Sequence, residues 1–492
     1  MQLRKSLFVT FLSTNFTTVV GFGVIVVLSR LLTPAEVGIF SITVVFVNIA
    51  AVFRDFGVSS YLRQEKDLTR ETKRSGLGLL ITTGWCLALL LYLVSDTLAA
   101  FYNQPGIGAV LRVLSISFAL VPFASYFHSL LARDLQAGTQ AMVNIVGTVV
   151  HASTCIGMAL HGHSYMSLAW ANVANLIFSI AAYLYLRPDH IPLLPSFRGW
   201  RRLMRFGSGA MVGDLAMMAN VALPDLMLGK LAGPYQVGLY SRANGLVGVL
   251  SQIISPTISY NALPYIARNH HANVPLGPML AKSASYLTVL AWPVYAVIAV
   301  FAEEVIRLLY GATWVEAAPL VLVICIHSAV RVGYALTSPA LMAVGRPYLS
   351  ALVSGSSLLV RVVLVLLLGA DDLMTFAIAI CIADIVTFPV AIVLLARYLG
   401  FTLRLAAAAH AQSLVAGGAC LALAMLLHLL MPFEWPLFLR LLLVGLAEGL
   451  LWTACVIGLR HPVTEELPVL LKNILPAQMA RRVTQMIERR HP

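Results

Sequence analysis

Residues 28–41 read LSRLLTPAEVGIFS, and residues 228–241 read LGKLAGPYQVGLYS, the same pattern two hundred positions later. Six positions are identical, among them Pro34/Pro234 and Gly38/Gly238. In each copy an apolar run ends at a cation, a proline-containing turn follows, and a second apolar run begins. The pattern predicts a helical hairpin that occurs twice, and therefore a chain built from two related halves.

The composition excludes a soluble globular protein. Hydrophobic residues make up 59% of the chain and charged residues only 11%, whereas soluble domains are about a quarter charged. The apolar residues form blocks long enough to cross a bilayer as helices, which satisfy their own backbone groups. The sequence therefore predicts an all-α integral membrane protein with about 14 transmembrane helices. The expected blocks are 8–30, 38–60, 76–98, 107–130, 140–161, 164–186, 206–229, 237–263, 281–302, 317–340, 349–369, 373–396, 406–431 and 436–459.

The positions of the cations predict the orientation. If the amino terminus is cytoplasmic, 24 of the 33 Lys and Arg residues fall in inner segments. The outer connections 101–106, 161–164 and 369–372 contain none. The positive-inside rule then puts both termini in the cytoplasm. The first block belongs to the repeat and no small-residue cleavage site follows it, so we expect it to be retained.

The crossings also predict the domain organisation. Six crossings separate the two copies of the hairpin, and an even number gives parallel repeats related by an axis along the membrane normal. Residues 1–186 then form an N-lobe of six helices, 206–400 a C-lobe of six, and 187–205 a cytoplasmic linker. Residues 401–460 add two helices, and 461–492 form a basic amphipathic tail suited to anionic lipid headgroups.

Several classes of chemistry find no support in the sequence. No GxxxxGK[ST] motif occurs, and all six cysteines lie in apolar blocks without metal-ligand spacing. His161 and His163 are two ligands with no third. The aromatic residues lie in the spans and not in the basic loops, so the net charge of +12 does not indicate nucleic-acid binding. We expect no cofactor, no metal and no nucleic-acid partner.

Several segments together resemble the polysaccharide transporter, or oligosaccharide-unit flippase, family of the multidrug/oligosaccharidyl-lipid/polysaccharide exporter superfamily. The resemblance covers about residues 1–400 and rests on the following segments: LSRLLTPAEVGIFS at 28–41, FRDFGVSSYLRQ at 53–64, VLRVLSISF at 110–118, LLARDLQ at 130–136, DLMLGKLAGPYQVGLYS at 225–241, LLYGATWVEAAPLV at 308–321 and ALMAVGRP at 340–347. It implies a two-lobed protein of fourteen helices in the bacterial inner membrane, which opens alternately to each face. It also implies transport of undecaprenyl-diphosphate-linked sugar units from the cytoplasmic to the periplasmic leaflet.

Two arginines in the second half are the first candidates for binding such a headgroup. Arg331 and Arg361 are expected near the middle of their spans, where a charge needs a cavity or a partner. A diphosphate needs cations that stay charged, and arginine offers forked donors. The alternative is a structural salt bridge, for instance to Asp384. His327 lies one turn before Arg331 and is either a coupling group or a packed, hydrogen-bonded histidine.

Two carboxylates of the 206–229 block are candidates for ion coupling. Asp214 and Asp225 are eleven residues apart, which brings them back to nearly the same helical face. Pro224 frees a backbone carbonyl beside Asp225, so a proton or Na⁺ site is plausible there. Alternatively, Asp225 pairs with Lys230 or Arg242 and holds the hairpin together.

A further charged pair is expected near the inner end of the second block. Arg54 and Asp55 are adjacent in sequence and therefore point about 100° apart on a helix, so each needs another partner. They are candidates for a gate at the cytoplasmic mouth, with Arg54 as a substrate-facing cation and Asp55 as a coupling group. The alternative is interfacial ion pairing.

The sequence-level hypothesis is a non-enzymatic flippase for exopolysaccharide, capsule or lipopolysaccharide assembly. Its partners are a lipid-linked oligosaccharide, membrane lipids, H⁺ or Na⁺, and a polysaccharide polymerase and chain-length complex. A multidrug antiporter or lipid II flippase of the same superfamily is the alternative. A membrane glycan polymerase or ligase is disfavoured, because the outer loops are too short to carry catalytic groups.

Overall fold

A computed structural model describes residues 2–465, apart from 56, 66–67, 188–193, 198–199, 258–261, 370–371 and 433. Over these residues the chain is helical and contains no β-strand. The chain divides into two compact units, Met1–Ser241 and Arg242–Pro492. The boundary falls inside α9, so both copies of the repeated segment belong to the first unit.

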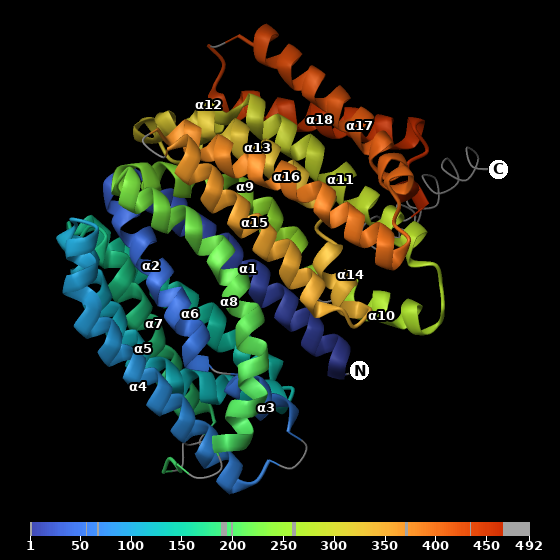
Figure 1. Ribbon diagram of the computed structural model, residues 1–492. Helices are drawn as coiled ribbons and strands as arrows, with labels where there is room; N and C mark the ends of the chain where they lie inside the picture. The colour runs from blue at the N-terminus through green and yellow to red at the C-terminus, as the bar shows by residue number, and fades with distance from the viewer. Residues whose placement is uncertain are drawn as a thin grey trace. The chain divides into compact units, whose positions relative to one another are not determined.

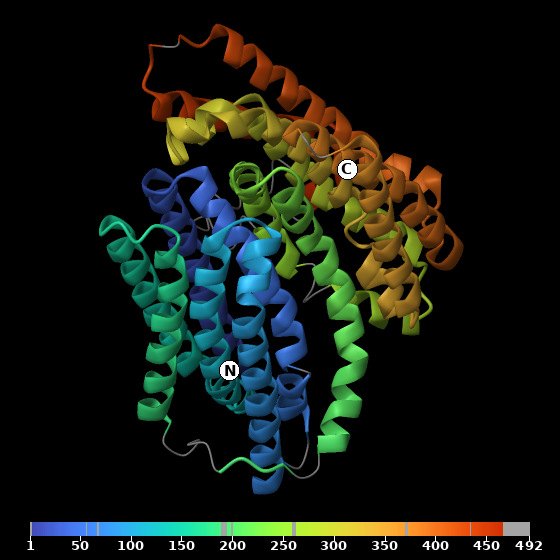
Figure 2. The same ribbon diagram turned by 60° about the vertical axis from the view of Figure 1, so that its left-hand side comes forward.

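The first unit is built from long helices joined by short turns (Figure 1). Its helices are α1 Gln2–Leu31, α2 Pro34–Asp55, α3 Val58–Gln64, α4 Arg70–Phe101, α5 Pro105–Arg133, α6 Ala137–Leu160, α7 Met166–Leu186, α8 Trp200–Leu231 and the beginning of α9 Pro234–Thr257. Figure 2 shows α4 and α5 running side by side along nearly their whole length.

The second unit combines long helices with short helical pieces at their ends. It contains α10 Leu263–His271, α11 Leu276–Val300, α12 Ala302–Leu309, the 3-10 turn η3 Ala312–Ala317, α13 Ala318–Gly333, α14 Thr337–Ala343, α15 Pro347–Leu368, α16 Leu373–Leu399, α17 Leu403–Leu430, α18 Leu437–Gly458 and η4 Pro462–Glu465. Helix α16 packs against both α13 and α15, and the three helices carry the charged cluster described below.

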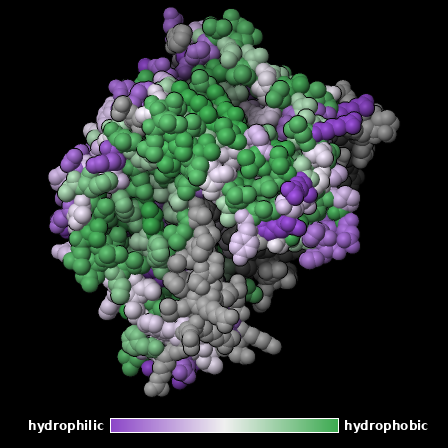
Figure 3. Space-filling model, in the orientation of Figure 1, coloured by the Kyte–Doolittle hydropathy of each residue, from purple (hydrophilic) through white to green (hydrophobic). Residues whose placement is uncertain are grey.

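The prediction of an all-α, multi-pass membrane protein is confirmed. In the described part of the chain, 12 helical segments are long and apolar enough to span a membrane. The predicted blocks 206–229 and 237–263 coincide with α8 and α9, many of whose side chains lie outside the described set. Hydrophobic side chains cover much of the surface over α4 and α5 in Figure 3, as expected for helices that face lipid. The count of fourteen, the orientation and the lobe boundaries stay predictions, and residues 466–492 of the predicted tail lie outside the described residues.

Two predicted blocks are interrupted. The 38–60 block contains the end of α2 at Asp55 and the start of α3 at Val58, with Gly57 in the left-handed region at φ 70° between them. The 317–340 block contains the end of α13 at Gly333 and the start of α14 at Thr337. Turns of this kind are tolerated at membrane depth where protein or a water-filled cavity surrounds them. The second break lies directly after Arg331.

Helix ends elsewhere have local causes. The side chain of Asp372 accepts a hydrogen bond from the backbone N–H of Thr375 and caps the first turn of α16. Gly400, at φ 70°, ends the same helix in the left-handed conformation that glycine adopts without strain. The backbone N–H of Thr33 donates to Glu36, whose N–H bonds back to the Thr33 hydroxyl, which fixes the start of α2.

The two copies of the repeated segment contact each other reciprocally. A Cβ atom added to Gly38 would lie 1.7 Å from the carbonyl oxygen of Pro234, and one added to Gly238 would lie 1.9 Å from that of Pro34. The hydroxyls of Ser41 and Ser241 are 3.2 Å apart. Each position of one copy thus contacts the corresponding region of the other copy, as expected around a local two-fold axis. The glycines are required because α2 and α9 cross too closely for any side chain.

Candidate functional site

A buried charged cluster lies in the second unit where α13, α15 and α16 meet. Asp384 is in the middle of α16, and its side chain is fully buried. Arg361 of α15 and His327 of α13 are also buried, at 5% and 8% exposure. An isolated charge at such a site would be strongly unfavourable, so its stability depends on its partners.

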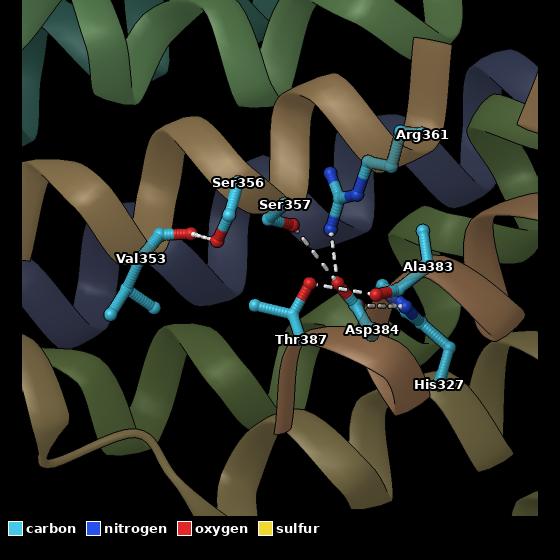
Figure 4. A network of polar contacts seen from close by, with 8 residues as sticks. All are labelled: His327, Val353, Ser356, Ser357, Arg361, Ala383, Asp384 and Thr387. Atoms are coloured by element: carbon cyan, nitrogen blue, oxygen red, sulfur yellow. Dashed lines mark hydrogen bonds and ion pairs between the residues drawn. The ribbon is translucent and has the colours of Figure 1, made fainter. Parts of the chain in front are cut away.

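All contacts of the cluster converge on the carboxylate of Asp384 (Figure 4). Arg361 donates from Nη2 to Oδ1 at 2.8 Å. The Nδ1 atom of His327 lies 2.5 Å from Oδ2. The hydroxyl of Ser357, one turn before Arg361 on α15, donates to Oδ1 at 3.3 Å. Three helices are thus tied to one carboxylate, and both of its oxygens are engaged.

The cluster contains one of the two arrangements that the sequence suggested for Arg361. Arg361 lies in the salt bridge to Asp384 that was the alternative to a cavity position. His327, for which the sequence allowed a coupling role or a packed, hydrogen-bonded position, contacts the same carboxylate. Their roles in substrate binding or coupling stay predictions, but their geometry is that of groups that fix α13 against α15 and α16.

Arg331 differs from the buried cluster. It lies one turn beyond His327, near the end of α13, and its side chain is exposed. In the described part of the chain Arg331 takes part in no ion pair. The exposed apolar residues of α13 are Leu322 and Ile326. At about 100° per residue, Arg331 points roughly 140° away from Ile326 and 180° away from Leu322. The guanidinium is therefore accessible on a side of α13 other than its apolar stripe.

Asp225 in the first unit lines a small pocket between α2 and α8. The pocket has a volume of about 170 Å³, and its polar groups are the carboxylate of Asp225, the amide of Asn48 and the hydroxyl of Ser41. The remaining wall is apolar and consists of Phe40, Val44, Val45, Met218, Val221 and Ala222. Carboxylate, amide and hydroxyl oxygens can hold a proton or a hard cation.

The alternative partners of Asp225 are engaged elsewhere. The Nζ atom of Lys230 donates to the carbonyl oxygen of Phe101 at 2.6 Å and lies 4.2 Å from the centre of its ring. The guanidinium of Arg242 lies 5.3 Å from the centre of the Trp314 ring. Within the described part of the first unit, Lys230 forms no ion pair with Asp225. The side chain of Asp214, the other carboxylate of this block, lies outside the described residues.

Arg54 and Asp55 are the last two residues of α2, and each has its own partner, as adjacent helical positions require. The guanidinium of Arg54 lies 5.2 Å from the centre of the Phe118 ring. Asp55 accepts a hydrogen bond from the hydroxyl of Ser59 across the break at Gly57. The hydrogen bond between Asp55 and Ser59 joins the end of α2 to α3 across this break.

The candidate residues thus fall into separate groups. Arg54, Asp55, Asp214 and Asp225 belong to the first unit, and His327, Arg331, Arg361 and Asp384 to the second. Within the units, the structure brings together His327, Arg361 and Asp384. Sequence reasoning missed Ser357 and Asn48. Ser357 could have been found from its position four residues before Arg361, on the same helical face. Asn48 depends on the packing of α2 against α8, for which the sequence carries no local signal.

The long apolar helices and the charges buried between them define a class, the multi-pass helical membrane proteins. The fold is similar to that of a solved structure of the lipid II flippase MurJ in an inward closed conformation, with a TM-score of 0.70 and 14% sequence identity, covering 92% of this chain and 99% of that one. At this identity the likeness concerns the fold alone.

The family follows from sequence. The family model described as "Polysaccharide biosynthesis protein" matches residues 27–319, and the chain belongs to this family. The chain is 24% identical to the teichuronic acid biosynthesis protein TuaB of Bacillus subtilis, over 82% of this chain and 84% of TuaB. It is 22% identical to the lipopolysaccharide biosynthesis protein WzxC of Escherichia coli, over 64% of each chain. The family resemblance read from the sequence is confirmed.

Proposed function

We propose that this protein is a flippase of the bacterial inner membrane. It moves undecaprenyl-diphosphate-linked oligosaccharide units from the cytoplasmic to the periplasmic leaflet by alternating access, for exopolysaccharide, capsule or lipopolysaccharide assembly. Family membership and the names of the relatives support the pathway, and the MurJ-like fold supports a transport mechanism.

The observation that carries the proposal is the accessible guanidinium of Arg331 on a membrane-embedded helix. A diphosphate that crosses the bilayer needs a cation that stays charged, and an arginine fork matches its oxygens. The salt bridge between Arg361 and Asp384, with His327 as a third member, fixes the helix that carries Arg331. In this proposal Arg331 binds the headgroup and the buried cluster positions it.

The pocket at Asp225 supports a separate coupling site for H⁺ or Na⁺. Asn48 and Ser41 provide neutral oxygens beside the carboxylate. One coupled charge gains about 2.3 kcal/mol per 100 mV of membrane potential, which is sufficient to bias the transport cycle. Arg54 and Asp55, at the break between α2 and α3, form part of the cytoplasmic gate.

The partners follow from the same proposal. The exported units are consumed by a polysaccharide polymerase and chain-length complex, and the protein has no catalytic role of its own. An antiporter for cationic drugs is the weaker alternative, because an accessible arginine repels such a substrate.

Deletion of the gene in its host tests the function directly. Lipid-linked oligosaccharides are extracted from the deletion strain and quantified by mass spectrometry, and their leaflet is determined with a membrane-impermeant glycosidase. We expect accumulation of intact units that the glycosidase cannot reach in whole cells and can reach in inverted vesicles. Absence of accumulation, or accumulation in the outer leaflet, would contradict a flippase.

A further inference from the structure

The pair of helices α1 and α6 in the first unit has two chemically different sides. The helices pack side by side (Figure 1). The hydroxyl of Ser13 donates to the carbonyl oxygen of Ala141 at 3.5 Å, and the hydroxyl oxygens of Thr17 and Thr148 lie 3.5 Å apart. Because the contacts advance in the same direction along both helices, α1 and α6 run parallel.

One side of the pair is apolar and exposed. It is formed by Leu12, Phe16 and Val19 of α1 and by Met142, Val146 and Val149 of α6. In membrane-spanning helices such a surface faces lipid.

The opposite side carries polar side chains, with the exposed Phe11 and Ile25 of α1 among them. Ser13 and Thr17 mark the side of α1 that faces α6. Around the axis of α1, Thr14 and Thr18 lie about 80–120° from this direction in one rotational sense. Leu12 and Phe16 lie in the opposite sense. On α6, Asn144 lies about 50° from the contact line in the sense opposite to Met142 and Val149. When two parallel helices face each other, residues on the same side of the pair are rotated in opposite senses about their own helix axes.

The residues Thr14, Thr18 and Asn144 therefore share the side turned away from the apolar surface, with His151 of α6 farther along it. Thr14 and Asn144 are exposed, and Thr18 and His151 are half-buried. We call these four residues the polar wall. The accessible hydroxyls, amide and imidazole of this helix pair thus gather on the polar wall, and most of its exposed apolar residues lie on the other side.

Two hydroxyls at the polar wall have their protons engaged within their own helices. The hydroxyl of Thr18 donates to the carbonyl oxygen of Thr14 on its own helix at 2.9 Å. Thr148, which lies on the side of α6 that faces α1, donates in the same way to the carbonyl oxygen of Asn144 at 2.7 Å. The protons are used and the lone pairs are left to accept from outside. Asn144 adds an amide with both donors and an acceptor.

The polar wall also lacks formal charge. Residues 6–29 and 137–160 contain no Asp, Glu, Lys or Arg. A diphosphate gains little there, and a cationic drug finds no carboxylate. Neutral hydroxyl and acetamido groups of a sugar, which both donate and accept, match hydroxyls, an amide and an imidazole.

We propose that the polar wall binds the glycan part of the lipid-linked unit. The inference rests on the proposed function and deepens it, because it separates recognition of the sugar by α1 and α6 from recognition of the diphosphate by Arg331. Each side-chain hydrogen bond to the sugar contributes about fivefold in affinity.

Binding to purified protein in nanodiscs tests the proposal. The probes are undecaprenyl diphosphate alone and the same lipid carrying one N-acetylglucosamine, galactose or glucose residue. We expect the wild-type protein to bind at least one glycosylated probe more tightly than the bare lipid. The double variant Asn144→Leu/Thr18→Val, which removes two such bonds, should lose about 25-fold in affinity for that probe and keep its affinity for undecaprenyl diphosphate.

The variant Met142→Leu, on the apolar side of the same helix, is the control and should retain the wild-type preference. The proposal is overturned if the wild-type protein prefers none of the glycosylated probes, if the double variant keeps the preference, or if it loses both ligands equally. Failure of the flippase function would instead show as absence of lipid-linked units in the deletion strain, a readout that does not involve this variant.

Discussion

Two groups of helices, one in each unit, hold polar side chains in different ways. In the second unit, α13, α15 and α16 bury full charges and neutralise them around Asp384. In the first unit, α1 and α6 carry hydroxyls, an amide and an imidazole, with no ionised residue over 6–29 and 137–160, while other helices of this unit carry charges, among them Arg54, Asp55 and Asp225. In our proposals, Arg331 of the second unit serves the anionic headgroup and the polar wall of α1 and α6 serves neutral sugars.

The strongest way to break this comparison is to remove the centre of the charged cluster. Asp384→Leu leaves Arg361 and His327 buried beside an apolar residue, and removal of one partner of a buried pair costs about 3–5 kcal/mol. We expect a large drop in the amount of folded protein and in its thermal midpoint, measured by fluorescence-detected size exclusion. The double variant Asp384→Leu/Arg361→Met should recover much of the loss. A single variant as stable as wild type would show that the cluster is not a structural unit.

The second prediction concerns the carboxylate of the first unit. Asp225→Asn removes the ionisable group of the pocket but preserves its shape, so folding should be unchanged while ion coupling is lost. One coupled charge at 100 mV is equivalent to about 2.3 kcal/mol, or roughly a 50-fold bias between leaflets. The measurement is substrate distribution in proteoliposomes with and without an imposed proton or Na⁺ gradient. The control Asp96→Asn alters an exposed carboxylate paired with Arg112 and should leave the gradient response intact. An unchanged response in Asp225→Asn would remove Asp225 from coupling.

The crossing of the repeated segments gives a third, smaller effect. Gly38→Ala forces a methyl group against the carbonyl oxygen of Pro234, and overpacking of this kind costs about 1–3 kcal/mol. Gly21→Ala, where a Cβ atom has no neighbour within 4 Å, should be neutral or slightly stabilising. The thermal midpoints of the two variants give the comparison. Equal midpoints would contradict the close crossing of α2 and α9.

The smallest effect is expected at the exposed carboxylate of α16. The backbone N–H of Thr375 holds the pKa of Asp372 below its usual value. The charged cap therefore stabilises the helix above about pH 4, and the contribution is lost as the pH falls through the lowered pKa. Asp372→Ala should lower the thermal midpoint slightly at pH 7, and by less as the pH falls through the lowered pKa. Asp372→Asn keeps a capping side chain without the titration. A difference between wild type and Asp372→Ala that does not shrink with falling pH would contradict this assignment.

The sequence predicted the parts of this architecture that depend on local patterns. The repeat at 28–41 and 228–241 predicted the hairpin, and hydrophobic length predicted the spans. The need to neutralise mid-span charges suggested the pairing of Arg361 with Asp384. The third member, His327, and the pocket of Asp225 with Asn48 could not be predicted, because they depend on how separate helices pack. The helix breaks after Asp55 and Gly333 could not be predicted from hydropathy, because the surrounding residues are as apolar as those of a continuous span.

The central claim is that Arg331 is a substrate-binding cation and not part of the structural cluster. The most direct measurement is the translocation rate of a lipid-linked oligosaccharide into proteoliposomes by wild type, Arg331→Ala and Arg331→Lys, with Arg307→Ala as control, since Arg307 is exposed and paired with Glu303 on α12. A charge-assisted hydrogen bond to phosphate is worth about 1.5–3 kcal/mol, so Arg331→Ala should be at least about tenfold slower, with partial recovery in Arg331→Lys. Its thermal midpoint should equal that of wild type. A wild-type rate in Arg331→Ala, or a loss of rate that only follows a loss of folded protein, would contradict the account.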